Sequence, residues 1–342
     1  MTRATRRAVT AWLLCACTLV AAMVVVGGIT RLTGSGLSIV EWAPVRGTLP
    51  PLSHAAWEQQ LAMYAQSPEG RLAHLDLPAF QRIFLVEWGH RLLGRLVGLT
   101  ILVPLSVFLL TRALPRRTAR RGIGAAVLVG AQGLMGWLMV ASGLVDVPHV
   151  SSVRLAMHLL LAFALFGLLA WELFDHLEVP VLEAPSPIPT RGYLALVVVT
   201  ITSGAAMAGT RGGFLFATFP TMNGAWVPPG VSLAVFRDPV SAHFAHRLMA
   251  LLVTLAVLAM IAAVRRAGDR LQRYVAAIAC AVAAQITLGA ATVVFHMPIV
   301  LAVTHQVSAL LVFGTALALV RAQSLETQTF LPPSTSEATS GP

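Results

Sequence analysis

Four histidines stand at matching places in four long apolar segments of this chain: His90, His158, His246 and His305. Each lies a few residues inside its segment, roughly 8–10 Å from the segment's edge at the rise of an α-helix. Two imidazoles that face each other across a helical bundle can bind a haem iron from opposite sides. Zinc or copper is the competing interpretation. Such sites normally add a cysteine, a carboxylate or a third histidine, and the second half offers only His243.

A carboxylate precedes the first of these histidines, in the stretch EWGH at 87–90. Glu87 lies three residues before His90 and therefore shares its helix face. Arg91 lies four residues after Glu87, at the spacing of a helical ion pair. Glu87 thus has two interpretations, a catalytic group beside a haem or the partner of a local salt bridge. Aligning His90 with His246 places His243 opposite Glu87, so only the first half carries the carboxylate.

Four arginines accompany the histidines at positions suited to anionic haem propionates, which favour guanidinium groups. Two of them directly follow a histidine, and two end the first and fifth apolar segments. The alternative is that they anchor the protein at the membrane surface, with long side chains that snorkel toward water. The four candidates are Arg31, Arg91, Arg211 and Arg247.

Glycines and glutamines also recur near the histidines. Gly94 and Gly98 follow His90 at one-turn intervals, which predicts a groove for a macrocycle or for a packed helix. Gln132 and Gln285 each precede a glycine by four residues. Their amides are predicted to bond either between helices or to a ligand.

The apolar segments are long enough to cross a membrane. The chain has 342 residues, of which 57% are hydrophobic and 11% charged, whereas a soluble domain is about 25% charged. Stretches of about 20 apolar residues can span a bilayer. The sequence therefore predicts an all-α integral membrane protein with eight spans, at 10–28, 84–111, 122–143, 153–173, 192–209, 242–264, 273–295 and 299–320.

The charge pattern predicts how the spans are oriented. The net charge of +10 comes entirely from arginine, which we attribute to membrane topology and anion binding rather than to nucleic acid. The Arg-rich loops 111–121 and 264–273 should be cytoplasmic, together with both termini. Loops 29–83 and 210–241, and the four histidines near them, should then face outside, in a bacterial inner (cytoplasmic) membrane. Five other histidines fall in loops or at helix ends and should be solvated: His54, His74, His149, His176 and His296.

The chain repeats a four-helix unit. GHRLLGRLVGL from Gly89 resembles AHRLMALLVTL from Ala245, and AQGLMG at 131–136 resembles AQITLG at 284–289. Because four spans is an even number, both units keep the same orientation, which predicts two pseudo-symmetric bundles in a parallel repeat. The predicted parts are a first bundle at 1–173, a cytoplasmic linker at 174–191, a second bundle at 192–323 and a polar tail at 324–342.

Three further functions compete with an enzyme at this point. A di-haem electron-transfer protein would place haems near both membrane faces, whereas all four histidines lie near one. A transporter built from parallel repeats would need polar residues at the midplane, and these segments have few. A haem-delivery protein without turnover is opposed only by Glu87.

Several long strings resemble the heme A synthase family, membrane enzymes that oxidise heme O to heme A for terminal oxidases. The resemblance covers about residues 20–320. It includes GGITRLTGSGLSIVEWAPVRGTLPPLS in the first external loop, EWGHRLLGR, SGLVDVPHVSSVRLAMHL, ATFPTMNGAWVP, AHRLMALL and THQVSALL. These strings are far more specific than a short motif, and the family has eight helices in two similar bundles.

The resemblance also implies roles for individual residues. His246 and His305 correspond to the pair that binds a b-type haem, and His90 and His158 to the pair that serves the substrate haem. Glu87 stands at the position of a carboxylate that the family requires. Some members carry a cysteine pair in external loops. Here Cys15, Cys17 and Cys280 all lie in apolar segments, so a thiol step does not carry over.

The implied reaction converts the C8 methyl group of heme O to the formyl group of heme A, by two hydroxylations and loss of water. The farnesyl tail of heme O needs an apolar groove open to lipid. The resemblance is compatible with contacts to a heme O synthase and to oxidase assembly factors, and with a homo-oligomer. It requires an electron donor, which the sequence leaves unidentified.

Overall fold

The computed structural model describes residues 1–324 except 44, 145–149, 180–181 and 183–187. Eight of its helices are long and apolar enough to cross a membrane, and the described residues form no strand. The prediction of an all-α membrane protein with eight spans is therefore confirmed. The spanning helices are α1 (Arg3–Leu32), α4 (Leu77–Leu110), α5 (Arg116–Gly143), α6 (Ser152–His176), α7 (Thr190–Gly209), α8 (Pro239–Ala263), α9 (Asp269–Val294) and α10 (Ile299–Ser324).

Most of these helices extend beyond the apolar stretches that predicted them, because polar residues cap their ends. The Asp76 carboxylate accepts a hydrogen bond from the Ala79 amide at the start of α4. Asp238 accepts from the Ser241 amide at the start of α8. In each case a proline, which suits the first turn of a helix, follows the cap. The caps give α4 and α8, which carry His90 and His246, a defined starting point.

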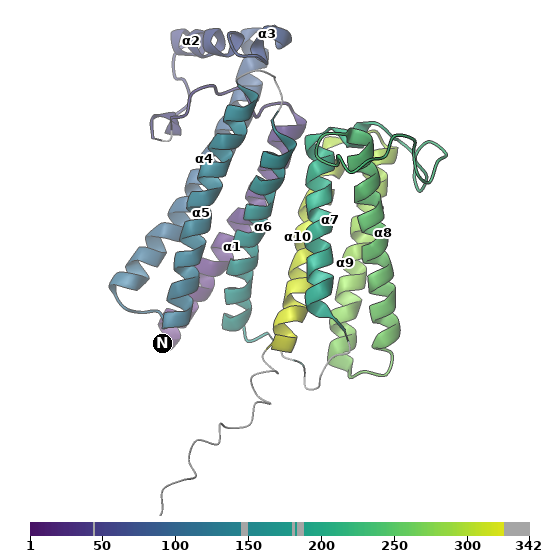
Figure 1. Ribbon diagram of the computed structural model, residues 1–342. Helices are drawn as coiled ribbons and strands as arrows, with labels where there is room; N and C mark the ends of the chain where they lie inside the picture. The colour runs from purple at the N-terminus through teal and green to yellow at the C-terminus, as the bar shows by residue number, and fades with distance from the viewer. Residues whose placement is uncertain (44, 145–149, 180–181, 183–187, 325–342) are drawn as a thin grey trace, which may run out of the picture.

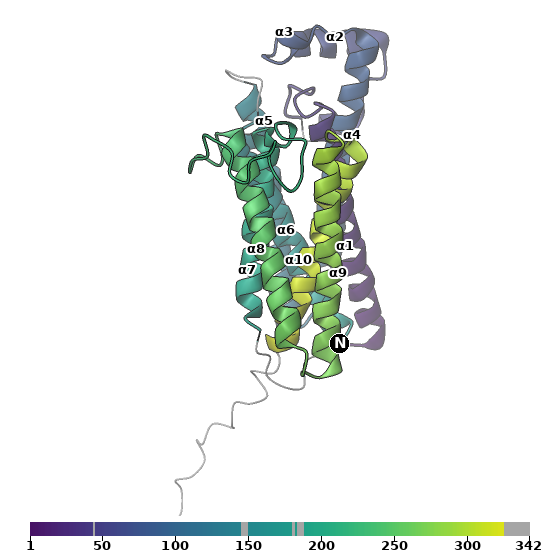
Figure 2. The same cartoon turned by 90° about the vertical axis from the view of Figure 1, so that its right-hand side faces the viewer.

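The helices form two groups, α1 with α4–α6 and α7 with α8–α10 (Figures 1 and 2). Helices α1 and α6 of the first group pack against α10, and α6 also packs against α7. The long loops before α4 and before α8 lie at one end of the molecule, and the N-terminus and the α8–α9 connection lie at the other. This agrees with the predicted grouping of the loops, whereas the side of the membrane that each end faces stays a prediction.

The first long loop contains two short helices, α2 (His54–Ala65) and α3 (Gly70–Ala73), which hydropathy did not predict. Helix α2 packs on the outer turns of α4 through an aromatic cluster. The ring centres of Trp57 and Phe84 are 5.0 Å apart, and those of the buried Tyr64 and of Phe80 are 5.2 Å apart. This cluster fixes α2 over the end of α4. Two single 3-10 turns, η1 (Arg46–Thr48) and η2 (Gly212–Phe214), complete the described elements.

A cluster of largely buried ion pairs lies at the end opposite the long loops, and one of them, Asp175 with Arg321, joins the two groups. Asp175 on α6 accepts from Arg121 on α5 at 2.6 Å and from Arg321 on α10 at 2.9 Å. Glu172, also buried, pairs with Arg121. His176 stacks into the same cluster, with only 7% of its side chain exposed. The expectation that His176 is solvated was wrong, because Glu172 and the first turns of α1 cover its side chain. His149 lies outside the described residues.

Candidate functional site

Each of the four histidines packs against a glycine of a neighbouring helix in its own group. A Cβ added to that glycine would lie close to the imidazole Cε1. At distances below 3 Å, such a Cβ does not fit, so only glycine is tolerated there. The distances are 3.1 Å for Gly27 and His90, 3.3 Å for Gly136 and His158, 2.9 Å for Gly204 and His246, and 2.8 Å for Gly289 and His305. The glycines therefore seat the histidines close to the adjacent helix.

Of the two occupants predicted for the surface at Gly94 and Gly98, a macrocycle or a packed helix, the structure shows neighbouring helices. A Cβ on Gly94 would meet Met23, and one on Gly98 would meet Val129. The small residues that matter for His90 come instead from α1, which sequence spacing along α4 cannot show.

Substituting Gly289 by alanine should displace His305. The added methyl would overlap the imidazole, and overpacking of this kind typically costs about 1–3 kcal/mol. We expect a lower unfolding temperature in detergent and a lower haem content per protein. Gly133→Ala on α5 is the matched control, because nothing lies within 4 Å of its Cβ position and alanine favours a helix over glycine. Equal behaviour of the two variants would show that the Gly289 contact is unimportant.

Hydrogen bonds fix the protonation of three of the four imidazoles. His305 Nδ1 lies 3.1 Å from the Gln285 carbonyl oxygen, which can only accept, so Nδ1 carries the proton. His246 Nδ1 lies 3.1 Å from the Ser203 hydroxyl, and His90 Nδ1 lies 3.4 Å from the Thr30 hydroxyl. Both hydroxyls donate to carbonyls of their own helices and thus accept from the imidazoles. The lone pair is then on Nε2, as a metal-binding histidine requires.

The second-half histidines lie opposite each other in a T-shaped arrangement. The ring centres of His246 and His305 are 6.2 Å apart, with their planes at 84°. In the first half, His90 and His158 are near enough for their charges to interact. The structure therefore brings together the two predicted pairs. In the described part of the chain, no three His, Cys, Asp or Glu side chains converge as a metal-ion site would require.

Glu87 is buried beside the first pair and makes a complete set of hydrogen bonds. Its Oε1 accepts from Arg91 Nε at 3.0 Å and from Nη2 at 2.6 Å. Its Oε2 accepts from the Ser38 hydroxyl at 2.7 Å and from the Ile39 amide at 2.8 Å. Glu87 is 3% exposed. The predicted ion pair with Arg91 is present, and the same carboxylate also binds the first long loop, through Ser38 and Ile39. Its catalytic role stays a prediction.

The equivalent residue of the second half, His243, has a similar structural place. Its Nδ1 donates to the Gly212 carbonyl at 2.9 Å, and its Nε2 accepts from Arg247 Nε at 2.9 Å. Arg247 also donates to the carbonyls of Thr218 and Thr221. Arg91 does the same with the carbonyls of the first loop. Each arginine thus ties one of the two long loops to the helix that carries a candidate haem ligand.

Arg31 and Arg211 are the propionate candidates with spare hydrogen-bonding capacity. Arg31 donates from Nη1 to the Ala208 carbonyl of the other group at 2.7 Å, while its buried Nε has no partner among the described residues. The two guanidinium groups are near enough to repel each other. Neither forms a salt bridge with a described carboxylate. An anionic group between them would relieve that repulsion. The propionate role of this pair stays a prediction.

Glu69, which the sequence gave no reason to select, lies near the same place. Burial and, to a smaller extent, the nearby charge of Glu87 raise the pKa of Glu69 from 4.5 to about 7, with Arg211 opposing the shift. Its Oε2 is buried without a described partner. Glu69 sits at the start of α3, so this loop helix brings a second carboxylate toward the first-half site.

Because its pKa is raised in the folded state, Glu69 should make the protein less stable as the pH rises from about 4.5 to about 7. The folded state keeps this proton up to about pH 7, whereas the unfolded state releases it near 4.5. Unfolding therefore becomes more favourable through that range. We expect Glu69→Gln to flatten the fall in unfolding temperature between pH 5 and pH 8. The exposed Glu41→Gln is the control, and a wild-type pH profile in Glu69→Gln would contradict this account.

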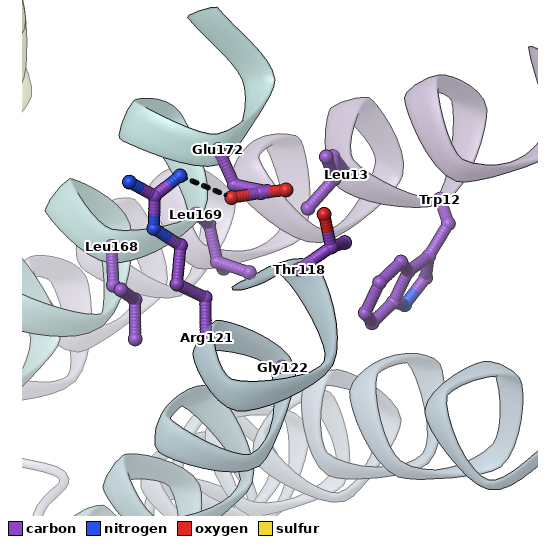
Figure 3. Close-up of a pocket in the computed structure, with 8 residues that line it drawn as sticks. All are labelled: Trp12, Leu13, Thr118, Arg121, Gly122, Leu168, Leu169 and Glu172. Atoms are coloured by element: carbon purple, nitrogen blue, oxygen red, sulfur yellow. Dashed lines mark hydrogen bonds and ion pairs between the residues drawn. The ribbon is translucent and has the colours of Figure 1, made fainter. Parts of the chain in front are cut away.

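A small cavity lies at the opposite end of the helices from the two histidine pairs, where the first turns of α1 and α5 meet the last turns of α6 (Figure 3). Trp12 and Leu13 line it from α1, and the Arg121–Glu172 pair borders it. It belongs to the ion-pair cluster between the helix groups. The three cysteines are free, and all of them lie in spanning helices, Cys15 and Cys17 in α1 and Cys280 in α9.

The fold and the site together define a class, a multi-pass membrane protein with two histidine pairs inside its helices and a buried carboxylate beside one pair. A family model described as cytochrome oxidase assembly protein (COX15-CtaA) matches residues 10–317. The chain belongs to this family. Because the match includes all eight spanning helices, it covers both histidine pairs.

Curated relatives from bacteria are similar over nearly their full length. The heme A synthase of Methylobacterium sp. is 44% identical over 337 residues, covering 94% of this chain and 93% of that protein. The heme A synthase of Nitrosospira multiformis is 41% identical over 334 residues, with 92% and 93% covered. That of Paracoccus denitrificans is 39% identical over 327 residues, with 90% and 86% covered.

Proposed function

We propose that this chain is a heme A synthase, an oxidoreductase that converts the C8 methyl group of heme O to a formyl group by two hydroxylations and loss of water. The names of its relatives support a role in heme A biosynthesis. The observation that carries the assignment is the pair of matched histidine sites, of which only the first has the Glu87 carboxylate.

The second-half residues fit a resident b-type haem. An imidazole nitrogen binds a metal at about 2 Å and lies roughly 1 Å from its ring centre, so two axial rings are separated by about 6 Å. His246 and His305 are 6.2 Å apart, and each has its Nδ1 bonded to an oxygen. The haem would supply electron transfer. The two histidines would hold it, with the Gly204 and Gly289 surfaces leaving room beside the rings.

The first-half residues would hold heme O as substrate. His90 and His158 would position its macrocycle, and Arg31 with Arg211 would bind its propionates. Glu87 would then either stabilise positive charge at the methyl carbon or activate water there. The farnesyl tail of heme O would extend into the surrounding lipid. Heme O synthase, oxidase assembly factors and an electron donor would be partners of this face or of its external loops.

We place both sites near the external side of a bacterial inner membrane, with the termini in the cytoplasm. A reporter that is active only in the cytoplasm should work when fused after residue 118 and be silent near residue 60. Matched expression of the two fusions is checked by immunoblot. Activity at 60 with silence at 118 would invert the orientation.

The direct test of the function is to purify the protein from cells that supply heme O and to separate its haems by chromatography. Heme b with heme O and heme A supports the enzyme. Heme b alone, with no heme A formed in the cells, favours an electron-transfer or haem-delivery protein.

A further inference from the structure

The second histidine of each pair is held in a different way. In the second half, Gln285 Nε2 donates to the main-chain oxygen of His305 at 3.0 Å. The Ser308 hydroxyl donates to Gln285 Oε1 and lies 3.0 Å from the same main-chain oxygen. The Gln285 main-chain oxygen accepts from His305 Nδ1. These bonds tie α9 to α10 on both sides of the imidazole and leave every polar atom of the group with a partner.

The first half lacks part of this network. Gln132 Nε2 again donates to the main-chain oxygen of the histidine, His158, at 3.1 Å. Yet Gln132 Oε1 and His158 Nδ1 are both buried without a hydrogen-bond partner among the described residues. Aligning His158 with His305 places Leu161 where the second half has Ser308. A leucine cannot donate to the glutamine.

The packing distances agree with this difference. A Cβ on Gly289 would lie 2.8 Å from His305 Cε1, whereas a Cβ on Gly136 would lie 3.3 Å from His158 Cε1. The contact between Nε2 of the histidine and Nε2 of the glutamine is similar in the two halves, at 3.5 Å and 3.3 Å. The difference therefore lies at Nδ1 and at the glutamine oxygen. A buried polar atom without a partner destabilises the arrangement that contains it, so His158 is held less firmly than His305.

We propose that Ser308, acting through Gln285, fixes His305 as a permanent haem ligand, and that Leu161 leaves His158 free to turn so that the substrate haem can enter and the product can leave. This inference rests on the proposed function, because it assigns a resident haem to one pair and an exchanging haem to the other. Ser308 and Leu161 are positioning residues, since neither touches the haem iron. An enzyme whose substrate is itself a haem needs such a distinction between two similar sites.

The rate of haem loss tests the second half. The purified protein is mixed with excess apomyoglobin, and haem transfer is followed by visible absorbance. Ser308→Ala and Ser308→Leu should lose the b-type haem about 10–100 times faster, the usual effect of removing a partner of a metal ligand. Ser308→Thr should restore the slow rate. Thr315→Ala is the control on the same helix, because the Thr315 hydroxyl bonds only carbonyls of α10.

The first half is tested by the reverse change. Leu161→Ser should supply the missing donor to Gln132 and slow the release of heme A at least about tenfold, the lower end of that same effect. In haem-free protein, nitrogen NMR should show a protonated Nδ1 on His305.

The outcomes separate this inference from the proposed function. Wild-type haem loss in folded Ser308→Ala, with helix content checked by circular dichroism, would overturn the role of Ser308 even if heme A is made. Unchanged heme A release in Leu161→Ser would overturn the role of Leu161. Slow haem loss in the wild type and fast haem loss in Ser308→Ala, with no heme A formed from supplied heme O, would support the role of Ser308 in fixing His305 and overturn the proposed function. If Ser308→Leu does not fold, Ser308→Ala decides.

Discussion

Replacing Glu87 by glutamine should lower heme A formation at least about a hundredfold, the usual effect of losing a positioned acid–base group, while the second-half haem is retained. Glutamine keeps the size of the side chain but removes its charge at the first-half site. The measurement is the ratio of heme A to heme O in cells that supply heme O, at equal protein level. Normal heme A yield at a normal protein level would remove Glu87 from the chemistry.

The structure gives this experiment a second readout. Glu87 also binds Arg91, Ser38 and the Ile39 amide, and breaking a buried pair can cost about 3–5 kcal/mol. Thermal unfolding therefore has to accompany the haem analysis. Ser38→Ala is the matched control, because it removes one bond to the carboxylate and leaves the carboxylate itself. Equal loss of heme A in both variants would point to the loop rather than to the charge.

Replacing either His246 or His305 by alanine should abolish the b-type spectrum of the purified protein. Each imidazole is proposed as one of two axial ligands, and losing a ligand should exceed the roughly 10–100-fold loss of affinity that follows from losing a ligand's partner. Reduced-minus-oxidised spectra measure the effect. The fold should persist, because each histidine makes only one or two hydrogen bonds in the helix interior.

The control for these variants is His243→Ala in the same helix. His243 bonds Gly212 and Arg247 instead of facing the other imidazole, so its loss should disturb the loop and leave the b-type spectrum in place. Retention of an unaltered b-type signal in both His246→Ala and His305→Ala would show that the haem assignment is wrong.

Much of the fold followed from the sequence, because a membrane span must be long and apolar. All eight spans were predicted, whereas the ends of α4 and α8 were not, since Asp76 and Asp238 cap them from polar loops. The loop helices α2 and α3 were missed because they pack through only a few aromatic residues, such as Tyr64 and Phe80. Hydropathy averaged over a span does not register either feature.

The pairing of the site residues was predictable to a similar extent. Equal depth selected His90, His158, His246 and His305, and helical spacing gave the Glu87–Arg91 ion pair. The glycines that pack against the histidines come from adjacent helices, so spacing along α4 could not identify Gly27 as the neighbour of His90. The loop carbonyls that occupy Arg91 and Arg247 were beyond sequence reasoning as well. A guanidinium beside a ligand histidine suits a propionate and a main-chain oxygen equally well.

The four glycine–histidine contacts never cross from one helix group to the other. Each group of four helices therefore carries the glycines that seat its own pair of histidines. A gene that doubled one such unit would have gained a second seated histidine pair without needing any new contact between the copies. Each copy could then change alone. The differences between Glu87 and His243 and between Leu161 and Ser308 are the kind of divergence that turns two identical cofactor sites into one cofactor site and one substrate site.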